Sequence, residues 1–151
     1  MLKLMLLENN YMNRNNKRIR VIIDTNLYIS MLIGKRIVEL RPIFAHPKYE
    51  LVITNALIQE IRLVTSRPKF IRYFKHEDVE EFLQYLTNNS ICYQIEKIPK
   101  RCRDPKDDFL LELAVVADAD YLLSGDSDLI EIKQIGNCRI LTVNELLETI
   151  V

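Results

Sequence analysis

The chain has 151 residues, of which 48% are hydrophobic and 28% charged, and its 21 basic and 21 acidic side chains leave a net charge of zero. Such a composition is typical of one globular domain, and no apolar stretch is long enough to cross a bilayer. The cysteines form no close pair, which argues against a disulfide framework and a zinc site. We therefore expect a cytoplasmic protein with no membrane partner and with free thiols at Cys92, Cys102 and Cys138.

Charge is unevenly distributed along the sequence. Residues 1–103 hold eighteen bases and ten acids, a net charge of +8, whereas residues 104–151 hold three bases and eleven acids, a net charge of −8. This asymmetry fits an acidic site beside a basic flank, and it fits equally well a chance segregation of charges on solvated faces. With three glycines in all, the sequence has no glycine-rich loop for a dinucleotide or a nucleoside triphosphate.

The first segment is a polar leader. Residues 1–17 have only a short apolar core and no small-residue cleavage site, so they do not form a signal peptide. We expect them to be a flexible leader in front of a single domain that spans residues 18–151.

Strands and helices alternate along the remaining sequence. In chain order, the expected elements are a strand at 20–24, helices at 26–35 and 37–46, a strand at 49–54, helices at 55–66 and 76–89, a strand at 91–98, a helix at 105–119, strands at 120–125 and 138–143, and a helix at 142–150. Pro68 sets the end of the third helix, because the residue before a proline disfavours the α region. The alternation predicts an α/β fold whose mainly parallel sheet is covered by helices on both faces.

Acidic residues follow two of the predicted strands. Asp24 closes the first strand, and Asp126 and Asp128 come directly after the strand at 120–125. In a parallel sheet, the strand ends and the starts of the following helices share one edge. We therefore expect these carboxylates to lie on the same side of the molecule.

Three further acids lie on helices that begin at this edge. Glu60 falls inside the apolar face of its helix, next to Leu57 and Leu63, where a glutamate is misplaced unless it borders a cleft. Asp107 and Asp108 open a helix whose following residues are apolar on nearly every side, so that helix is expected to be largely buried. The first turn of such a helix would place both carboxylates at the rim of the core.

Several carboxylates in one cleft repel one another, and a divalent cation relieves that repulsion. Oxygen ligands without histidine or cysteine favour Mg²⁺ or Mn²⁺. A metal ion of this kind can activate a water molecule, and the oxygens of a phosphodiester complete its coordination. The pattern therefore indicates a metal site that acts on a phosphodiester.

Each acid also has a structural explanation, which the sequence leaves open. Asp24 could cap the next helix, and Asp107 could interact with a helix dipole. Asp126 and Asp128 could be ordinary turn residues, and Glu60 could reach solvent through its rotamer. The combination of acids on one edge favours a site over these separate explanations.

Four motifs resemble those of a known family. "VIIDTNLYIS", the glutamate in "ALIQEI", "CRDPKDDFLLELA" and "ADYLLSGDSDL" are similar to the ordered motifs of PIN-domain proteins, over about residues 19–146. The likeness is greatest to the branch of toxins from toxin–antitoxin pairs. It implies a three-layer α/β/α sandwich, a Mg²⁺- or Mn²⁺-dependent endoribonuclease, an antitoxin partner and a homodimer. The alternative is a catalytically inert PIN-like module that binds RNA or protein.

The resemblance also assigns roles to residues. It implies that the catalytic and metal-binding acids are Asp24, Glu60, Asp108 and Asp126. Asp108 is preferred to Asp107 because it lies fourteen residues before Leu122, the spacing expected of the family. Auxiliary or positioning roles beside the site are implied for Asp128, Asn26 and Ser124.

A basic segment runs from residue 62 to residue 75 and contains no acid. We expect RNA phosphates to contact its five cations, Arg62, Arg67, Lys69, Arg72 and Lys75. The aromatic residues interleaved with them could stack unpaired bases, or they could pack into the core or a dimer interface. A second basic cluster, at 97–106, runs into the acidic helix.

Overall fold

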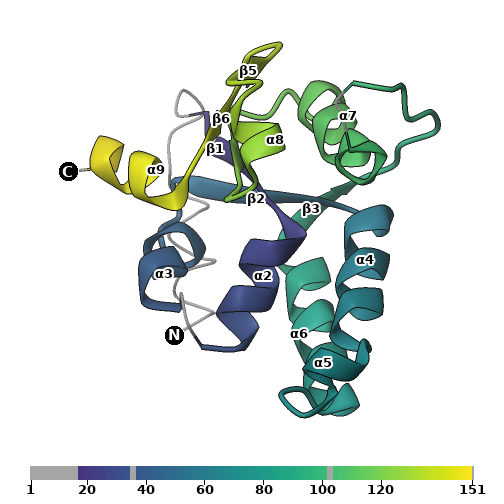
Figure 1. Ribbon diagram of the computed structural model, residues 1–151. Helices are drawn as coiled ribbons and strands as arrows, with labels where there is room; N and C mark the ends of the chain where they lie inside the picture. Colours follow the sequence, from purple (N-terminus) through teal and green to yellow (C-terminus); the bar gives the residue numbers. More distant parts are fainter. Residues whose placement is uncertain (1–16, 35–36, 102–103, 151) are drawn as a thin grey trace.

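The structure is a computed structural model that describes residues 17–34, 37–101 and 104–150 (Figure 1). The strands are β1 (Ile19–Ile23), β2 (Tyr49–Thr54), β3 (Ser90–Tyr93), β4 (Tyr121–Leu123), β5 (Gln134–Ile135) and β6 (Cys138–Leu141). The helices are α2 (Thr25–Leu32), α3 (Ile37–Ala45), α4 (Asn55–Thr65), α5 (Pro68–Ile71), α6 (His76–Asn88), α7 (Asp108–Val116), α8 (Ser127–Ile130) and α9 (Val143–Ile150), with a 3₁₀ turn at Pro105–Asp107. The leader expected at residues 1–17 lies outside the described residues except for Lys17.

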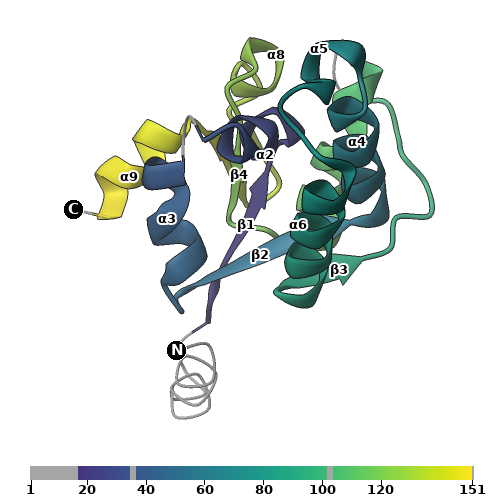
Figure 2. The same ribbon diagram turned by 90° about the horizontal axis from the view of Figure 1, so that it is seen from below.

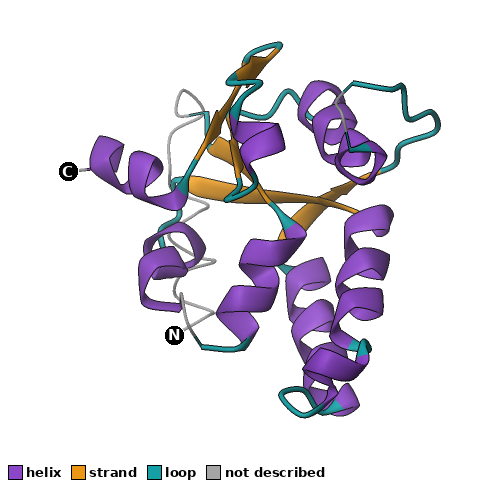
Figure 3. Cartoon of the chain, viewed as in Figure 1, coloured by secondary structure: helices purple, strands orange, loops and turns teal. Residues whose placement is uncertain are grey.

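The strands form one sheet in the order β3-β2-β1-β4-β6-β5, in which each neighbouring pair is parallel apart from β5 and β6. From β1 to β3 the chain moves across the sheet in one direction, and from β4 to β6 it moves in the other. Because parallel crossovers are right-handed, the two sets of connecting helices cover opposite faces. Figures 1, 2 and 3 show α2 to α6 on one face, and α7 and α8 on the other. The expected α/β/α arrangement with a mainly parallel sheet is confirmed.

The central strands form the middle of the core. Val21, Ile22 and Ile23 of β1 are completely buried, as are Leu122 and Leu123 of β4. A strand that is covered on both faces needs apolar side chains on both, which explains the unbroken apolar runs in the sequence. At the other end of the chain, Thr142 and Glu145 form the expected capping box of α9: the Glu145 amide donates to the Thr142 hydroxyl, and the Thr142 amide donates to the Glu145 carboxylate.

Two expectations about apolar segments were wrong. The strand predicted at 91–98 ends at Tyr93, because β2, the strand it pairs with, ends at Thr54, which is opposite Tyr93. The helix predicted to be buried on nearly all sides has an open face, since Val115 and Val116 of α7 are 42% and 44% exposed. Hydrophobic periodicity alone predicts neither the end of β3 nor the exposed face of α7, because both depend on which elements pack against them.

Three short elements were not predicted, namely α5, α8 and the strand β5. β5 forms a hairpin with β6 in which Ile135 pairs with Cys138, leaving Gly136 and Asn137 as a two-residue turn. Gly136 has a φ of +55°, a conformation that glycine adopts readily. A glycine–asparagine pair between two apolar stretches is a recognised hairpin signal, so this strand was detectable from the sequence.

Other expectations concerned thiols and membranes. Cys92 is an exposed free thiol and Cys138 a buried one, whose pKa burial raises to about 12, whereas Cys102 lies outside the described residues. None of the helices in the described ranges has the length and apolar character needed to span a bilayer.

Candidate active site

The direction of strand order reverses between β1 and β4, which are neighbours in the sheet although 100 residues separate them in the sequence. In open α/β sheets, ligands bind outside the carboxyl ends of the strands at such a switch point. Asp24 follows β1 directly, and Ser124 follows β4 directly. The first acids and polar residues singled out in the sequence therefore meet at the place where this fold most often holds a ligand.

Asp24 is buried there, with 4% of its surface exposed. It occupies the N-cap position of α2, yet its side chain makes no capping hydrogen bond. Instead, its Oδ2 accepts a hydrogen bond of 2.8 Å from the Ser124 hydroxyl. Burial raises the pKa of Asp24; the Ser124 hydroxyl and the nearby Asn26 amide lower it again, and the charges of Glu60 and Asp126 raise it further. The hydrogen bond from Ser124, which comes from a different strand end, shows that Asp24 does more than begin α2.

Ser124 joins the ends of the two central strands. Its hydroxyl donates to Asp24 and accepts a hydrogen bond of 3.0 Å from the Asp126 amide, and its own amide donates to the Leu141 carbonyl of β6. The Oδ1 atom of Asp126 accepts a hydrogen bond of 2.9 Å from the Asp128 amide and so caps α8. The carboxylates of Asp24 and Asp126, which follow β1 and β4, are therefore each fixed by a hydrogen bond from the segment after β4.

Asp107 lies against this pair. Its pKa is raised to about 7, mainly by burial and then by the negative charges of Asp24, Asp126 and Asp104, with a hydrogen bond to Asp126 that favours the protonated form. Its Oδ2 atom is buried and has no hydrogen-bond partner among the described residues. An orphaned carboxylate oxygen beside two other carboxyl groups calls for a proton or a cation.

Asp108, the residue preferred from the sequence, has different contacts. It is 4% exposed, and its Oδ1 accepts a hydrogen bond of 2.9 Å from the backbone amide of Arg101. That contact ties the loop after β3 to the start of α7. The structure brings Asp107 into electrostatic contact with Asp24 and Asp126, which adds Asp107 to the candidates beside Asp108. Asp107 ends the 3₁₀ turn and Asp108 begins α7, so the two adjacent side chains point in different directions.

Glu60 lies in the middle of α4, at the edge of its buried face. Leu57 is completely buried, whereas Leu63, which was expected on the same face, is 63% exposed. The Glu60 side chain is half-buried, and it lies between the buried face of α4 and solvent. Its Oε2 accepts a hydrogen bond from the Thr25 hydroxyl, and its charge contributes to the raised pKa of Asp24.

The remaining predicted auxiliary residues occupy the rim. Asn26 is exposed in the first turn of α2, and Asp128 is half-buried in the first turn of α8.

The donor set fits a hard divalent cation. Within the described ranges, no three side chains of histidine, cysteine, aspartate or glutamate converge closely enough to hold a metal ion in this conformation. Burial, and then the neighbouring negative charges, raise the pKa values of Asp24 and Asp107, and the buried Oδ2 of Asp107 has no hydrogen-bond partner among the described residues, so a cation at this edge would stabilise the ionised carboxylates. Carboxylate oxygens without nitrogen or sulfur ligands match the preference of Mg²⁺ and Mn²⁺.

The basic segment lies at the far end of α4, around α5 (Figure 1). The guanidinium of Arg62 forms an ion pair of 2.7 Å with Glu80 and donates a hydrogen bond of 3.0 Å to the side chain of Gln59. Four other cations of the segment are exposed, namely Arg67, Lys69, Arg72 and Lys75. Of the residues predicted to contact RNA, Arg62 is thus the one that already has a carboxylate partner.

The aromatic residues of this segment divide between the two roles left open. Phe70 and Phe74 are partly buried and pack against the core, whereas Tyr73 is 53% exposed. The Arg72 guanidinium lies 4.9 Å from the centre of the Tyr73 ring. Tyr73 is therefore the aromatic side chain available to stack on a base.

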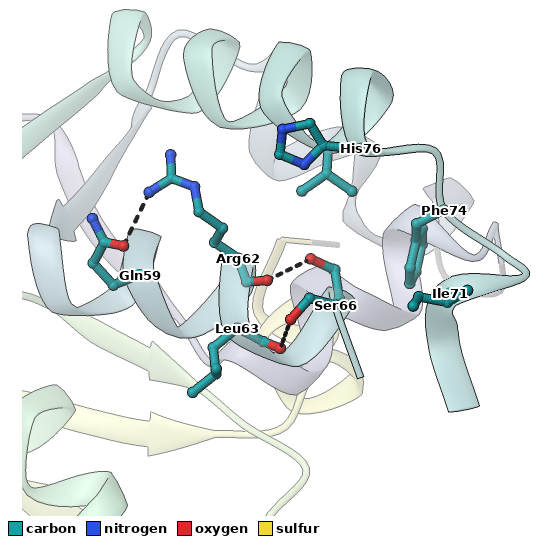
Figure 4. Close-up of a pocket in the computed structure, with 9 residues that line it drawn as sticks. Gln59, Arg62, Leu63, Ser66, Ile71, Phe74 and His76 are labelled. Atoms are coloured by element: carbon teal, nitrogen blue, oxygen red, sulfur yellow. Dashed lines mark hydrogen bonds between the residues drawn. The ribbon is translucent and has the colours of Figure 1, made fainter. Parts of the chain in front are cut away.

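A groove of about 450 Å³ lies between α4, α5 and the start of α6 (Figure 4). Its lining is mainly apolar, from Leu63, Ile71, Phe74 and Val79, with Gln59 and Arg62 along one wall. This groove and the exposed cations form a surface distinct from the acidic edge but on the same helix as Glu60.

The second basic cluster lies next to α7. Lys97, Lys100 and Lys106 are exposed, whereas the Arg101 guanidinium pairs with Glu112 of α7 at 2.7 Å. Arg103 lies outside the described residues.

Comparisons with known proteins agree with this fold. A family model described as a PIN domain matches residues 20–128. The structure is similar to a chain of VapBC2 from Rickettsia felis, determined bound to a DNA fragment from their promoter, with a TM-score of 0.55 and 13% identity over 82% of this chain and 98% of that one. It is also similar to the PIN domain endonuclease Utp24, with a TM-score of 0.51 and 17% identity over 82% of this chain and 84% of that one. Comparison with curated protein sequences gave no match. The chain therefore belongs to the PIN-domain family, whose members are generally nucleases.

Proposed function

We propose that this chain is a Mg²⁺- or Mn²⁺-dependent endoribonuclease that hydrolyses RNA phosphodiester bonds. The observation that carries the proposal is the meeting of Asp24, Asp107 and Asp126 where the two central strands end, with one buried carboxylate oxygen left without a partner. Membership of a family of nucleases supports the same reaction class.

The proposed metal-binding residues are Asp24, Asp107, Asp126 and Glu60, and Asp108 remains the candidate favoured by the resemblance. When bound, the ion would polarise the scissile phosphate and lower the pKa of an attacking water. The chain itself orients the carboxylates: the Ser124 hydroxyl holds Asp24, and the Asp128 amide holds Asp126. These hydrogen bonds restrict the rotamers of Asp24 and Asp126, and the carboxylates would close further around the ion when it binds.

The wild-type protein tests this proposal directly. We expect it to cleave single-stranded RNA in the presence of Mn²⁺ or Mg²⁺, to lose that activity in a chelator, and to melt at a higher temperature with Mn²⁺ because the ion binds only the folded state. The measurements are cleavage of a broad RNA panel and thermal melting with and without metal. If neither cleavage nor a melting shift occurred, the alternative of an inert module that binds RNA or protein would replace the nuclease.

RNA is proposed to pass over the exposed cations near α5. The triple change Arg67→Ala, Lys69→Ala and Arg72→Ala should weaken the binding of single-stranded RNA and reduce the salt dependence of the binding constant by about 2 in the log–log slope, since each phosphate contact contributes about 0.7. Binding is measured in a chelator, so that no cleavage intervenes, between about 50 and 200 mM salt.

A matched control removes three cations at the opposite edge of the sheet, Lys17, Lys48 and Arg139. Lys48 and Lys17 precede β2 and β1, and Arg139 pairs with Tyr121 at the beginning of β4. The control should leave the salt slope unchanged. Equal slopes for the two triple variants would mean that the cations around α5 do not follow the RNA backbone.

The toxin role, the antitoxin partner and the homodimer are proposed on the basis of the sequence resemblance. Exposed apolar side chains that a protein partner could cover lie on α4, α5 and α7, where Leu63, Ile71, Val115 and Val116 are between 42% and 63% exposed. Leu63 and Ile71 line the same groove, whereas Val115 and Val116 lie on the opposite face of the sheet, and clustered exposed apolar side chains are more typical of interaction surfaces than of solvated faces.

A further inference from the structure

Thr25 makes a contact that crosses from one helix to another. It begins α2 directly after Asp24, is only 3% exposed, and donates its hydroxyl hydrogen to Oε2 of Glu60 on α4, 35 residues further along the chain. Neither the sequence motifs nor the resemblance singled out this hydroxyl. It is the one contact between the described side chains that joins the Asp24 strand end to Glu60 through a hydrogen bond.

The usual behaviour of a buried threonine on a helix is different. The hydroxyl of Thr65, also buried, bonds the carbonyls of Ile61 and Arg62 in its own helix at 2.8 and 3.1 Å. Local bonds of this kind are the common solution for threonine. The Thr25 hydroxyl is instead directed at a carboxylate, so it serves Glu60 and not the backbone of α2.

Glu60 needs such a partner. Its side chain is long, half-buried and close to the negative charge of Asp24, which repels it towards solvent. A glutamate loses considerable rotamer freedom when it is fixed, and an unfixed carboxylate at the edge of a cleft would swing into water. A donated hydrogen bond to one oxygen opposes both effects and leaves the other oxygen available.

We propose that Thr25 is a positioning residue that holds the Glu60 carboxylate facing the acidic edge, so that Glu60 can act there as a ligand. The inference rests on the proposed metal-dependent function and adds a residue to it. Contacts that orient metal ligands typically change metal affinity or activity by about 10- to 100-fold when they are removed.

The test measures Mn²⁺ binding to the full chain by isothermal titration calorimetry, alongside RNA cleavage. Thr25→Val keeps the shape of the side chain but removes the hydroxyl, and it should weaken Mn²⁺ binding by about tenfold and lower the cleavage rate. Thr25→Ser keeps the hydroxyl and should restore binding to within about twofold of the wild type. Thr65→Val, which removes a buried hydroxyl from the helix that carries Glu60, should bind Mn²⁺ as the wild type does even if it melts earlier.

A double-mutant cycle separates positioning from a general loss of structure. If Thr25 acts through Glu60, Thr25→Val should weaken Mn²⁺ binding no further in a Glu60→Gln background. Wild-type affinity in Thr25→Val, a serine variant as weak as the valine variant, or a full further loss in the Glu60→Gln background would each overturn the positioning role. A wild-type protein without any Mn²⁺ binding would overturn the metal site itself, an outcome that is separate from the other three.

Discussion

Asp24→Asn is expected to lower the metal-dependent cleavage of RNA by at least about 100-fold and to abolish the Mn²⁺-dependent rise in melting temperature. The substitution keeps the size of the side chain, and its amide oxygen can still accept the hydrogen bond from Ser124. What it removes is the negative charge of a buried carboxylate, since Asp24 is only 4% exposed. If Asp24 were only the N-cap of α2, asparagine would cap the helix equally well, and both cleavage and the melting shift would be nearly unchanged.

The same substitution should stabilise the metal-free protein. The pKa of Asp24 is raised above its ordinary value of 3.8 in the folded state, so the folded protein binds this proton more tightly than the unfolded chain does. Stability is therefore lost as the pH rises from the unfolded pKa through the folded pKa. Asparagine carries no such penalty, and we expect a gain of about 1 kcal/mol, or roughly 2–4 °C, at neutral pH. The gain should vanish at a pH below the ordinary pKa of 3.8.

Asp120→Asn provides the matched control for both measurements. Asp120 precedes β4 at the opposite edge of the sheet, and its Oδ2 accepts a hydrogen bond of 2.9 Å from the Arg20 amide. It is thus another aspartate that holds the end of a central strand, but it lies away from the acidic edge. This variant should cleave RNA as the wild type does. Equal activity of Asp24→Asn and the wild type would remove Asp24 from the site.

The second large effect is expected at Asp107. Asp107→Asn should lower cleavage by about 100-fold and weaken Mn²⁺ binding, because it removes the carboxylate that lies against Asp24 and Asp126 and has an unpartnered oxygen. Asp108→Asn should have a much smaller effect, within about tenfold, because an amide oxygen can still accept the hydrogen bond from the Arg101 amide.

This pair of variants decides between the spacing in the sequence and the contacts in the structure. Cleavage rates and Mn²⁺ affinities of the two variants are measured side by side, with melting curves to show that both are folded. A larger loss for Asp108→Asn than for Asp107→Asn would support the assignment that the resemblance implies.

The fold could be predicted from the sequence because its signals are local and agree with one another. Apolar runs such as Val21–Ile23 mark strands that are covered on both faces, and their alternation with helices limits the topology to a parallel sheet. The ends of the elements and the exposed faces of the helices were harder to predict. The end of β3 depends on where β2 stops, and the exposure of Leu63 depends on the space left by α5 and α6.

The residues of the site could be grouped from the sequence but not oriented. The convergence of Asp24 and Asp126 follows from strand order, which alternation predicts. Adjacent residues on a helix point about 100° apart, so the directions of Asp107 and Asp108 depend on the 3₁₀ turn before α7, which the sequence pattern does not mark. The Thr25 contact with Glu60 depends on the packing of α2 against α4, for which a single sequence offers no signal.

The hydrogen bond between Ser124 and Asp24 has a consequence for protein synthesis, since it closes a loop of 100 residues. β1 is synthesised 100 residues before the neighbouring strand β4, and the acid at position 126 follows β4. Until then Asp24 has no Ser124 to hold it and no second strand end beside it. A fragment of this chain that ends before Ser124 therefore cannot assemble the acidic edge, and under the proposed function it would not cleave RNA.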